Sequence, residues 1–129
     1  MPSPILIVDD DSDLRLALTE LLEEEGYAVE GAADGRGALV KLQAGLRPSL
    51  ILLDLMMPGM NGWDFRTAQL EDPTLRALPV VVVTASGSDL ATIQSQLGSV
   101  ELVAKPIHPA ELLDVVGRLA RPVPLRNLA

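Results

Sequence analysis

The sequence contains no cysteine and only one histidine, His108, so it offers no thiolate or multi-histidine set for a transition metal. Without cysteine, the sequence gives no indication of whether the protein works in an oxidising or a reducing compartment. Lysine and arginine number only 10 against 18 acidic residues, and the basic residues are scattered, which argues against a nucleic-acid-binding surface. The longest apolar runs have the length of a strand, so we expect no membrane span. Any macromolecular partner is therefore expected to be a protein.

The composition that remains is that of one globular domain. The chain has 129 residues, of which 48% are hydrophobic and 22% charged, and its formal net charge is −8. This length is enough to bury one core. The first residues, Met1-Pro-Ser-Pro-Ile5, lack the basic and then apolar segment of a secretion signal, so we expect a cytoplasmic protein. We expect residues 1–121 to form the domain and residues 122–129 to be a proline-containing tail or the start of a linker.

Hydrophobic periodicity predicts five strands that alternate with five helices. The strands are short apolar or β-branched runs bounded by turn residues, and we expect them at residues 4–9, 27–33, 50–53, 79–84 and 101–104. Apolar residues at helical spacing follow each strand, and the expected inward-facing ones are Leu14, Ala17, Leu18, Leu21, Leu22, Ala38, Leu39, Leu42, Trp63, Phe65, Ala68, Leu70, Leu90, Ile93, Leu97, Leu112, Leu113, Val116 and Leu119. Because parallel strands need crossover connections, this alternation predicts an α/β fold with helices on both faces of a parallel sheet.

Residues that can carry chemistry stand at the ends of four of the expected strands. They are Asp9 and Asp10 after the first strand, Asp54 at the end of the third, Thr84 at the end of the fourth and Lys105 after the fifth. Because the carboxyl ends of parallel strands lie at one edge of the sheet, we expect these side chains to meet there. Alone, Asp54 would be interpreted as a turn former and the acidic run after the first strand as a helix cap. The combination favours a functional site.

Three crowded carboxylates repel one another, and a hard cation relieves that repulsion. Magnesium fits best, because it binds carboxylate, water and phosphate oxygens and needs no nitrogen or sulfur ligand. A carboxylate beside a divalent cation, a lysine and a hydroxyl suits phosphoryl transfer, in which the carboxylate oxygen attacks phosphorus in line. The expected product is an aspartyl phosphate.

Four short motifs occupy these strand ends. They are Val8-Asp9-Asp10, Leu53-Asp54-Leu-Met-Met-Pro58-Gly-Met-Asn-Gly62, Val83-Thr84-Ala85 and Ala104-Lys105-Pro106. Together and in this order they resemble the receiver domain of two-component response regulators, and the resemblance runs from Ile5 to about Leu119. It implies a single doubly wound, flavodoxin-like (βα)5 domain over residues 1–121, whose parallel sheet has the strand order 2-1-3-4-5.

The resemblance also implies roles for the acidic residues. Asp54 would accept a phosphoryl group from a phosphohistidine on a sensor histidine kinase or a histidine phosphotransfer protein. Asp9 and Asp10 would hold Mg²⁺, with Asp54 and the backbone carbonyl of Met56 completing the protein ligands.

Lys105 would pair with one phosphoryl oxygen and Thr84 would hydrogen-bond another, and the Lys105–Pro106 peptide bond would be cis. The chain departs from the family pattern at Leu102, where an aromatic residue usually stands three positions before the lysine. Ile107 likewise replaces a common phenylalanine. In the family, the aromatic side chain before the lysine swings inward when the threonine is drawn to the phosphoryl group. This part of the conformational switch is therefore missing from the sequence.

Two further positions bear on how long an aspartyl phosphate would last. Met56 and Ser86 lie two residues beyond Asp54 and Thr84 respectively. A thioether cannot orient an attacking water as an amide or carboxylate could, and a serine hydroxyl could do so only weakly. We therefore predict slow self-hydrolysis of the phosphorylated form.

The expected function is that of a signalling phosphoacceptor, not an enzyme, whose phosphorylation changes its binding to a downstream protein effector. One alternative is a docking module that never uses phosphate, which Leu102 favours slightly and the intact acidic residues oppose. Another is a phosphohydrolase, which needs a general acid two residues after the nucleophile, where Met56 stands. The sequence does not identify the cognate kinase or the output partner. It is compatible with a homodimer, and with a chain that acts alone or within a longer protein such as a hybrid kinase.

Overall fold

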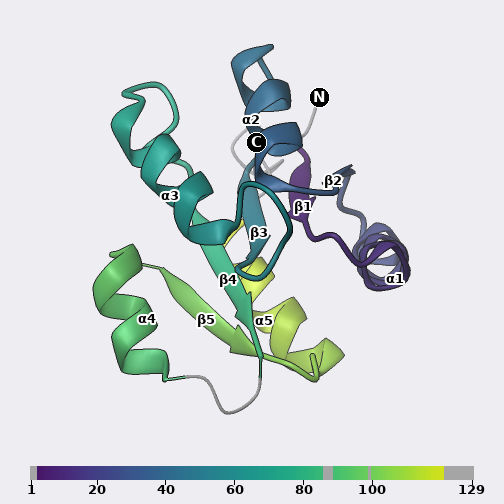
Figure 1. Cartoon of the computed structure of the whole chain (residues 1–129). Coiled ribbons are helices and arrows are strands. Elements are labelled where there is room, and N and C mark those ends of the chain that lie inside the picture. The colour runs from purple at the N-terminus through teal and green to yellow at the C-terminus, as the bar shows by residue number, and fades with distance from the viewer. Residues whose placement is uncertain (1–2, 86–88, 99, 121–129) are drawn as a thin grey trace.

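The computed structural model describes residues 3–85, 89–98 and 100–120. Over these ranges strands and helices alternate strictly from β1 to α5 (Figure 1). The strands are β1 (Ile5–Val8), β2 (Val29–Ala32), β3 (Leu50–Asp54), β4 (Val80–Thr84) and β5 (Glu101–Ala104). The helices are α1 (Ser12–Glu24), α2 (Gly35–Gln43), α3 (Gly62–Glu71), α4 (Leu90–Leu97) and α5 (Pro109–Leu119). The expected alternation is confirmed, although β2 is shorter than the predicted run at residues 27–33.

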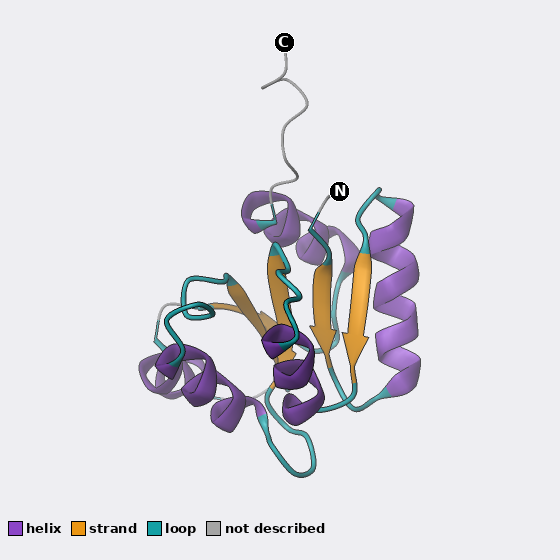
Figure 2. Ribbon diagram, turned by 90° about the horizontal axis from the view of Figure 1, so that it is seen from above, coloured by secondary structure: helices purple, strands orange, loops and turns teal. Residues whose placement is uncertain are grey.

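All strands pair in parallel in the order β2-β1-β3-β4-β5, which confirms the expected fold class. Helices lie on both sides of the strands (Figure 2). In register, Val8 lies beside Leu53, Asp54 beside Val83, and Thr84 beside Ala104. The carboxyl ends of the four strands that carry candidate site residues are therefore neighbours at one edge of the sheet.

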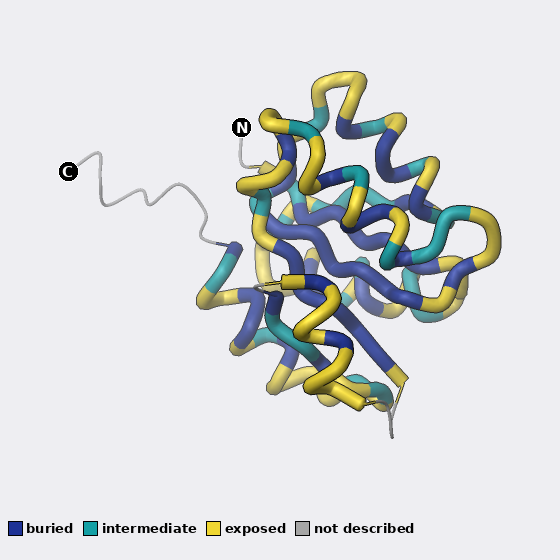
Figure 3. Tube along the Cα trace, turned by 60° about the vertical axis from the view of Figure 1, so that its left-hand side comes forward, coloured by how far each residue is buried: buried dark blue, intermediate teal, exposed yellow. Residues whose placement is uncertain are grey.

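The sheet is buried on both faces, and its side chains alternate between two cores. Ile5 and Ile7 of β1 pack in the core that α1 and α5 cover, while Leu6 and Val8 pack in the core that α2, α3 and α4 cover. Every residue of β1, β3 and β4 is buried, so these strands are continuously dark blue in Figure 3. Near-continuous hydrophobic strands are what a sheet covered on both faces requires.

Three of the expected inward-facing helical residues are exposed instead. Leu70 is 41% exposed, because Gln69 takes the inward position four residues after the fully buried Phe65. Leu90 is 44% exposed as the first residue of α4, and Ala17 lies at the margin of the apolar stripe of α1. A hydrophobic residue at approximately helical spacing was therefore insufficient evidence for burial.

The first four helices begin at the same edge of the sheet at which the strands end. Their N-terminal N–H groups are capped by the side chains of Asp11, Asp34, Asn61 and Asp89. Asp11 accepts from the N–H groups of Asp13 at 3.0 Å and Leu14 at 3.1 Å. The helix-cap interpretation of the acidic run is thus correct for Asp11.

Candidate functional site

The fold brings the three expected carboxylates together. Asp54 is the last residue of β3, and Asp9 and Asp10 follow β1 directly. One oxygen from each carboxylate lies within 4.8 Å of the others. Asp9 and Asp54 are only 3% and 5% exposed, whereas Asp10 is exposed to solvent. The cluster therefore has two buried carboxylates and one at the surface.

Lys105 supplies a positive charge to the same cluster. Its Nζ lies 3.7 Å from Asp54 Oδ1 and 3.8 Å from Asp9 Oδ2. The Lys105–Pro106 peptide bond is cis, as the sequence resemblance implied. The Lys105 N–H donates to the carbonyl oxygen of Thr84 at 2.8 Å, so the ends of β4 and β5 are joined beside the acidic residues.

Thr84 is the last residue of β4 and is only 4% exposed. Its neighbour Asp54 ends the adjacent strand, paired with Val83, the residue before Thr84. The sheet register thus places a hydroxyl-bearing residue at the same edge as the carboxylates and the ammonium group, as the sequence predicted.

Burial raises the pKa of the Asp54 carboxyl above its ordinary value, because the charged form loses solvation. The charge of Asp9 raises this pKa further, while the charge of Lys105 and the N–H of Met56 lower it. That N–H donates to Asp54 Oδ1 at 3.4 Å. Asp54 is therefore held in a position where its negative charge is only partly compensated by the protein.

The donor set fits a hard divalent cation. In an octahedral Mg²⁺ complex with bonds of about 2.1 Å, ligand oxygens lie about 3–4 Å apart. The carboxylate oxygens of Asp9, Asp10 and Asp54, all within 4.8 Å of one another, approach that spacing. They supply oxygen ligands only, which is the set that magnesium prefers.

The loop after Asp54 is packed tightly against the strand it leaves. A Cβ atom added to Gly62 would lie 2.7 Å from both the Asp54 carbonyl oxygen and the Leu55 Cα, so no side chain fits there. The Gly62 N–H also donates to the Leu55 carbonyl oxygen at 3.0 Å. Met56 points its thioether outward and is 69% exposed. The close approach of Gly62 thus fixes the loop beside the acidic cluster.

At the two positions where the sequence departs from the family pattern, aliphatic side chains are half-buried. Leu102 packs against the core under α2, α3 and α4, and Ile107 against the core under α1 and α5. Ser86, whose hydroxyl entered the expectation about self-hydrolysis, lies outside the described residues.

Arg15 is a residue of this edge that no motif in the sequence marks. It belongs to α1, and its Nη1 donates to the backbone carbonyl oxygen of Asp9 at 2.6 Å. The sequence places Arg15 six residues beyond Asp9 in the following helix. This spacing alone does not show whether the side chain faces the end of β1 or the solvent.

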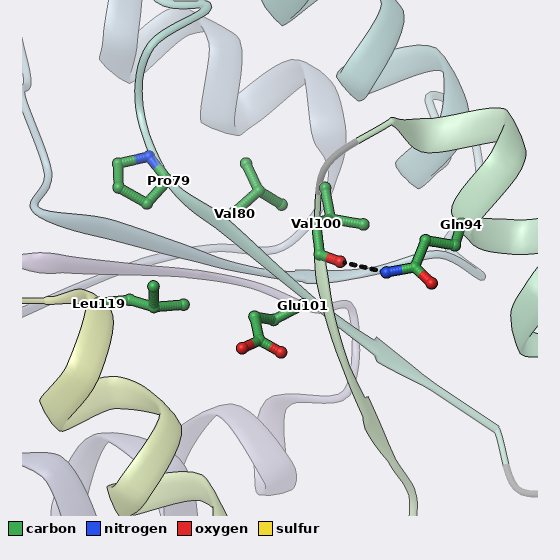
Figure 4. Close-up of a pocket in the computed structure, with 6 residues that line it drawn as sticks. All are labelled: Pro79, Val80, Gln94, Val100, Glu101 and Leu119. Carbon is green, nitrogen blue, oxygen red and sulfur yellow. Dashed lines mark hydrogen bonds between the residues drawn. The ribbon is translucent and has the colours of Figure 1, made fainter.

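A pocket of about 420 Å³ lies at the other end of the sheet (Figure 4). It opens at the amino ends of β4 and β5, where Gln94 Nε2 donates to the Val100 carbonyl oxygen at 3.0 Å. None of the candidate site residues lines this pocket, whose lining residues are Pro79, Val80, Gln94, Val100, Glu101 and Leu119. The chemistry of the chain is therefore concentrated at the acidic edge and not in this pocket.

Comparison with known proteins gives matches along nearly the whole chain. The model of the response regulator receiver domain family matches residues 5–117. The DNA-binding response regulator MtrA of Mycolicibacterium paratuberculosis (strain ATCC BAA-968 / K-10) is 38% identical over 123 residues, which are 94% of this chain and 53% of that protein. The transcriptional regulatory protein CpxR of Escherichia coli K12 is 40% identical over 124 residues, 91% of this chain and 49% of that protein. The chain thus spans about half the length of the curated relatives it matches.

Solved structures show the same fold. The chemotaxis protein CheY4 of Vibrio cholerae has a TM-score of 0.82 and 30% identity, over 92% of this chain and 99% of that one. The response regulator protein TrrA of Thermotoga maritima, solved in complex with Mg²⁺ and BeF, has a TM-score of 0.79 and 31% identity, over 91% of this chain and 98% of that one. Within the described ranges, no helix combines the length and the hydropathy needed to cross a membrane.

Proposed function

The chain belongs to the response regulator receiver domain family, and we propose that Asp54 is the residue on which it accepts a phosphoryl group. The observation that carries this proposal is the grouping of three carboxylates within 4.8 Å of one another, with Lys105 Nζ 3.7 Å from Asp54. A phosphoryl group that enters this edge meets a nucleophile, a cation site and a fixed positive charge.

Asp54 is the carboxylate best suited to act as the nucleophile. It ends the central strand β3, and its burial and the charge of Asp9 both disfavour its free ionised form. As the Asp54 oxygen bonds to phosphorus, the bond from phosphorus to the donor's imidazole nitrogen breaks, and an acyl phosphate remains on the chain. The product is a mixed anhydride, in which the carboxylate charge is replaced by the charge of the phosphoryl oxygens, and these are the oxygens that the cation and Lys105 would contact.

Asp9, Asp10, Asp54 and the backbone carbonyl of Met56 are the proposed ligands of Mg²⁺. When bound, the ion would offset negative charge on the phosphoryl oxygens during the transfer. Asp9 is held for this role by the Asp11 N–H, which donates to Asp9 Oδ1 at 2.9 Å. Its second oxygen faces Lys105.

Lys105 and Thr84 are the proposed contacts for the other phosphoryl oxygens. The Lys105 N–H donates to the Thr84 carbonyl oxygen, so the ammonium group and the threonine side chain extend from adjacent points of the sheet edge. The ammonium group would form an ion pair with one phosphoryl oxygen, and the hydroxyl of Thr84 would donate to another.

A phosphohistidine on a sensor histidine kinase or a histidine phosphotransfer protein is the proposed donor, and a protein effector is the proposed output partner. The net charge of −8 opposes direct contact between this chain and a nucleic acid. The names of MtrA and CpxR describe DNA binding and transcriptional regulation by proteins about twice as long. We propose that such an output, like a cytoplasmic location, belongs to the whole protein in which the receiver acts.

Incubation with acetyl phosphate and MgCl₂, followed by intact-mass measurement, tests the proposal. We expect the wild-type chain to gain one phosphoryl group and the Asp54→Asn variant to gain none. The matched control is Asp64→Asn, which removes an exposed carboxylate from the first turn of α3 and should leave phosphorylation unchanged. Absence of the added mass in wild type would contradict the proposal and favour the phosphate-independent docking module. Persistence of the added mass in Asp54→Asn would contradict the assignment of Asp54 and place the phosphoryl group on another residue.

A further inference from the structure

Arg15 reaches from α1 to the end of β1. Its Nη1 donates to the Asp9 carbonyl oxygen at 2.6 Å, across six residues of sequence. Arg15 is half-buried, and its helix α1 packs beside β1 and β2 (Figure 1). The N–H of the same residue, Asp9, donates to the Ala32 carbonyl oxygen of β2 at 3.1 Å. Both backbone polar groups of Asp9 are therefore held by neighbouring elements.

Gly31 of β2 leaves the space through which Arg15 passes. A Cβ atom at Gly31 would lie 3.4 Å from Arg15 Cδ and 3.5 Å from Arg15 Nε. These are van der Waals contact distances, so any side chain at this position would lie directly against Arg15. A glycine inside a strand often marks a close approach by another group, and here that group is Arg15.

The carbonyl that Arg15 holds belongs to the peptide unit that joins Asp9 to Asp10. Because a peptide unit is planar, fixing its oxygen also fixes the direction in which the chain continues to the Asp10 Cα. Asp10 is exposed, so packing does little to orient its side chain. The hydrogen bond from Arg15 therefore fixes the peptide unit from which the Asp10 residue, with its carboxylate, extends.

We propose that Arg15 is a positioning residue for the metal site, which sets the Asp9–Asp10 peptide so that the Asp10 carboxylate joins the other two. This inference rests on the function proposed above. A residue that orients a metal ligand without touching the metal typically contributes tenfold to a hundredfold to metal affinity. Arg15 orients the ligand by donating a hydrogen bond to a backbone carbonyl and not to the side chain of a ligand.

Positioning and simple charge effects have opposite signs at this site. A guanidinium near the carboxylates repels a divalent cation, so its removal would tighten metal binding if charge were its only effect. If Arg15 positions Asp10, its removal weakens metal binding although a repelling charge has been lost. The direction of the change alone therefore distinguishes the two roles.

The test is titration of the chain with Mn²⁺ alone, with free Mn²⁺ measured by electron paramagnetic resonance. We expect Arg15→Met to raise the Kd about tenfold and Arg15→Lys to recover part of the loss, because a lysine ammonium can also donate to a carbonyl. Gly31→Val, which keeps the arginine but places two methyl groups beside it, should weaken binding in the same direction. Arg36→Met is the matched control, since Arg36 is an exposed arginine of α2 near the same edge.

Several outcomes separate this inference from the proposed function. If wild type fails to bind Mn²⁺, or Asp10→Asn binds it as well as wild type does, the metal site itself is wrong. If wild type binds and Arg15→Met binds equally or more tightly, the positioning role is wrong and the metal site stands. Should Arg15→Met fail to fold, Gly31→Val decides the question, because valine suits a strand interior and retains Arg15. In the double variant, Gly31→Val should add nothing to the effect of Arg15→Met.

Discussion

Replacement of Asp54 by asparagine is expected to stabilise the chain when no divalent cation is present. At an effective dielectric constant of about 20, two unit charges about 4 Å apart interact by about 4 kcal/mol. Asp54 lies 3.7 Å from Lys105 and within 4.8 Å of Asp9 and Asp10. The repulsion from Asp9 outweighs the attraction to Lys105, and the exposed Asp10 adds a smaller repulsion. Together with the cost of burying the charge, we expect a net destabilisation of about 2 kcal/mol. Asparagine has the same shape and retains an oxygen that can accept from the Met56 N–H.

The assay is urea and thermal unfolding at pH 7 in EDTA, followed by circular dichroism. For a chain of this length, about 2 kcal/mol corresponds to a rise of roughly 8 °C in the unfolding midpoint. Excess Mg²⁺ should reduce this difference, because it stabilises only the protein that retains the full set of carboxylates. Glu20→Gln serves as the charge-matched control, since Glu20 is exposed on α1 and its replacement should change stability by less than about 0.5 kcal/mol.

The stability difference between wild type and Asp54→Asn should also depend on pH, and the pKa of Asp54 determines its direction. The pKa of Asp54 is raised in the folded chain above its ordinary value of 3.8, so the folded state binds this proton more tightly than the unfolded state does. The contribution of Asp54 to the stability of the wild type therefore falls as the pH rises from 3.8 through the raised pKa, and the advantage of Asp54→Asn grows over that window and then levels off. An Asp54→Asn variant that is equally or less stable than wild type at pH 7 in EDTA would refute the electrostatic reasoning.

Four further substitutions test packing and the lifetime of the phosphorylated form. Gly62→Ala should destabilise the chain by about 1–3 kcal/mol in urea unfolding, because the added methyl group has no space. The control Gly117→Ala, on the exposed side of α5, should stabilise the chain by about 0.5–1 kcal/mol. Equal effects of the two substitutions would contradict the packing argument. Arg66→Met should cost about 2–3 kcal/mol, because Arg66 Nε donates to the Leu97 carbonyl oxygen at 3.0 Å in a buried position, and an unchanged urea midpoint would rule this out. Met56→Asn should shorten the lifetime of the aspartyl phosphate, followed by intact mass after removal of acetyl phosphate; a wild type that loses phosphate faster than the variant would disprove slow self-hydrolysis.

The sequence was sufficient to predict the fold and the grouping of the candidate site. Strands buried on both faces appear as continuous apolar runs, so β3 and β4 were visible without any other information. Once the strands are known to be parallel, the chemistry at Asp9, Asp54 and Lys105 must converge, because strand ends far apart in sequence share one edge. The distances of 3.7 and 3.8 Å around Lys105 are the geometric result of that rule.

Side-chain contacts that depend on the exact facing of a helix could not be predicted in this way. The sequence assigned Leu70 to the core, but the inward position belongs to Gln69, whose amide nitrogen donates to the carbonyl oxygens of Leu75 at 3.0 Å and Leu78 at 3.1 Å. Those carbonyls lie in the connection between α3 and β4, where backbone groups need partners that no helix or strand provides. A buried amide here donates hydrogen bonds to backbone carbonyls, which a leucine could not do. Hydropathy alone does not show that these carbonyls need a donor.

The same limit explains why Arg15 and Gly31 carry no signal in the sequence although they meet beside the proposed metal ligands. Each is unremarkable in its own element: arginine is a good helix former, and glycine weakens a strand. Their combination has a physical meaning only after β1, β2 and α1 have packed, because the arginine then reaches the Asp9 carbonyl across the position that glycine leaves open. The carboxylates of the site thus follow from strand topology, whereas the orientation of their peptide backbone depends on a helix–sheet contact. A substitution at Gly31 should therefore affect metal binding without altering any group that touches the metal.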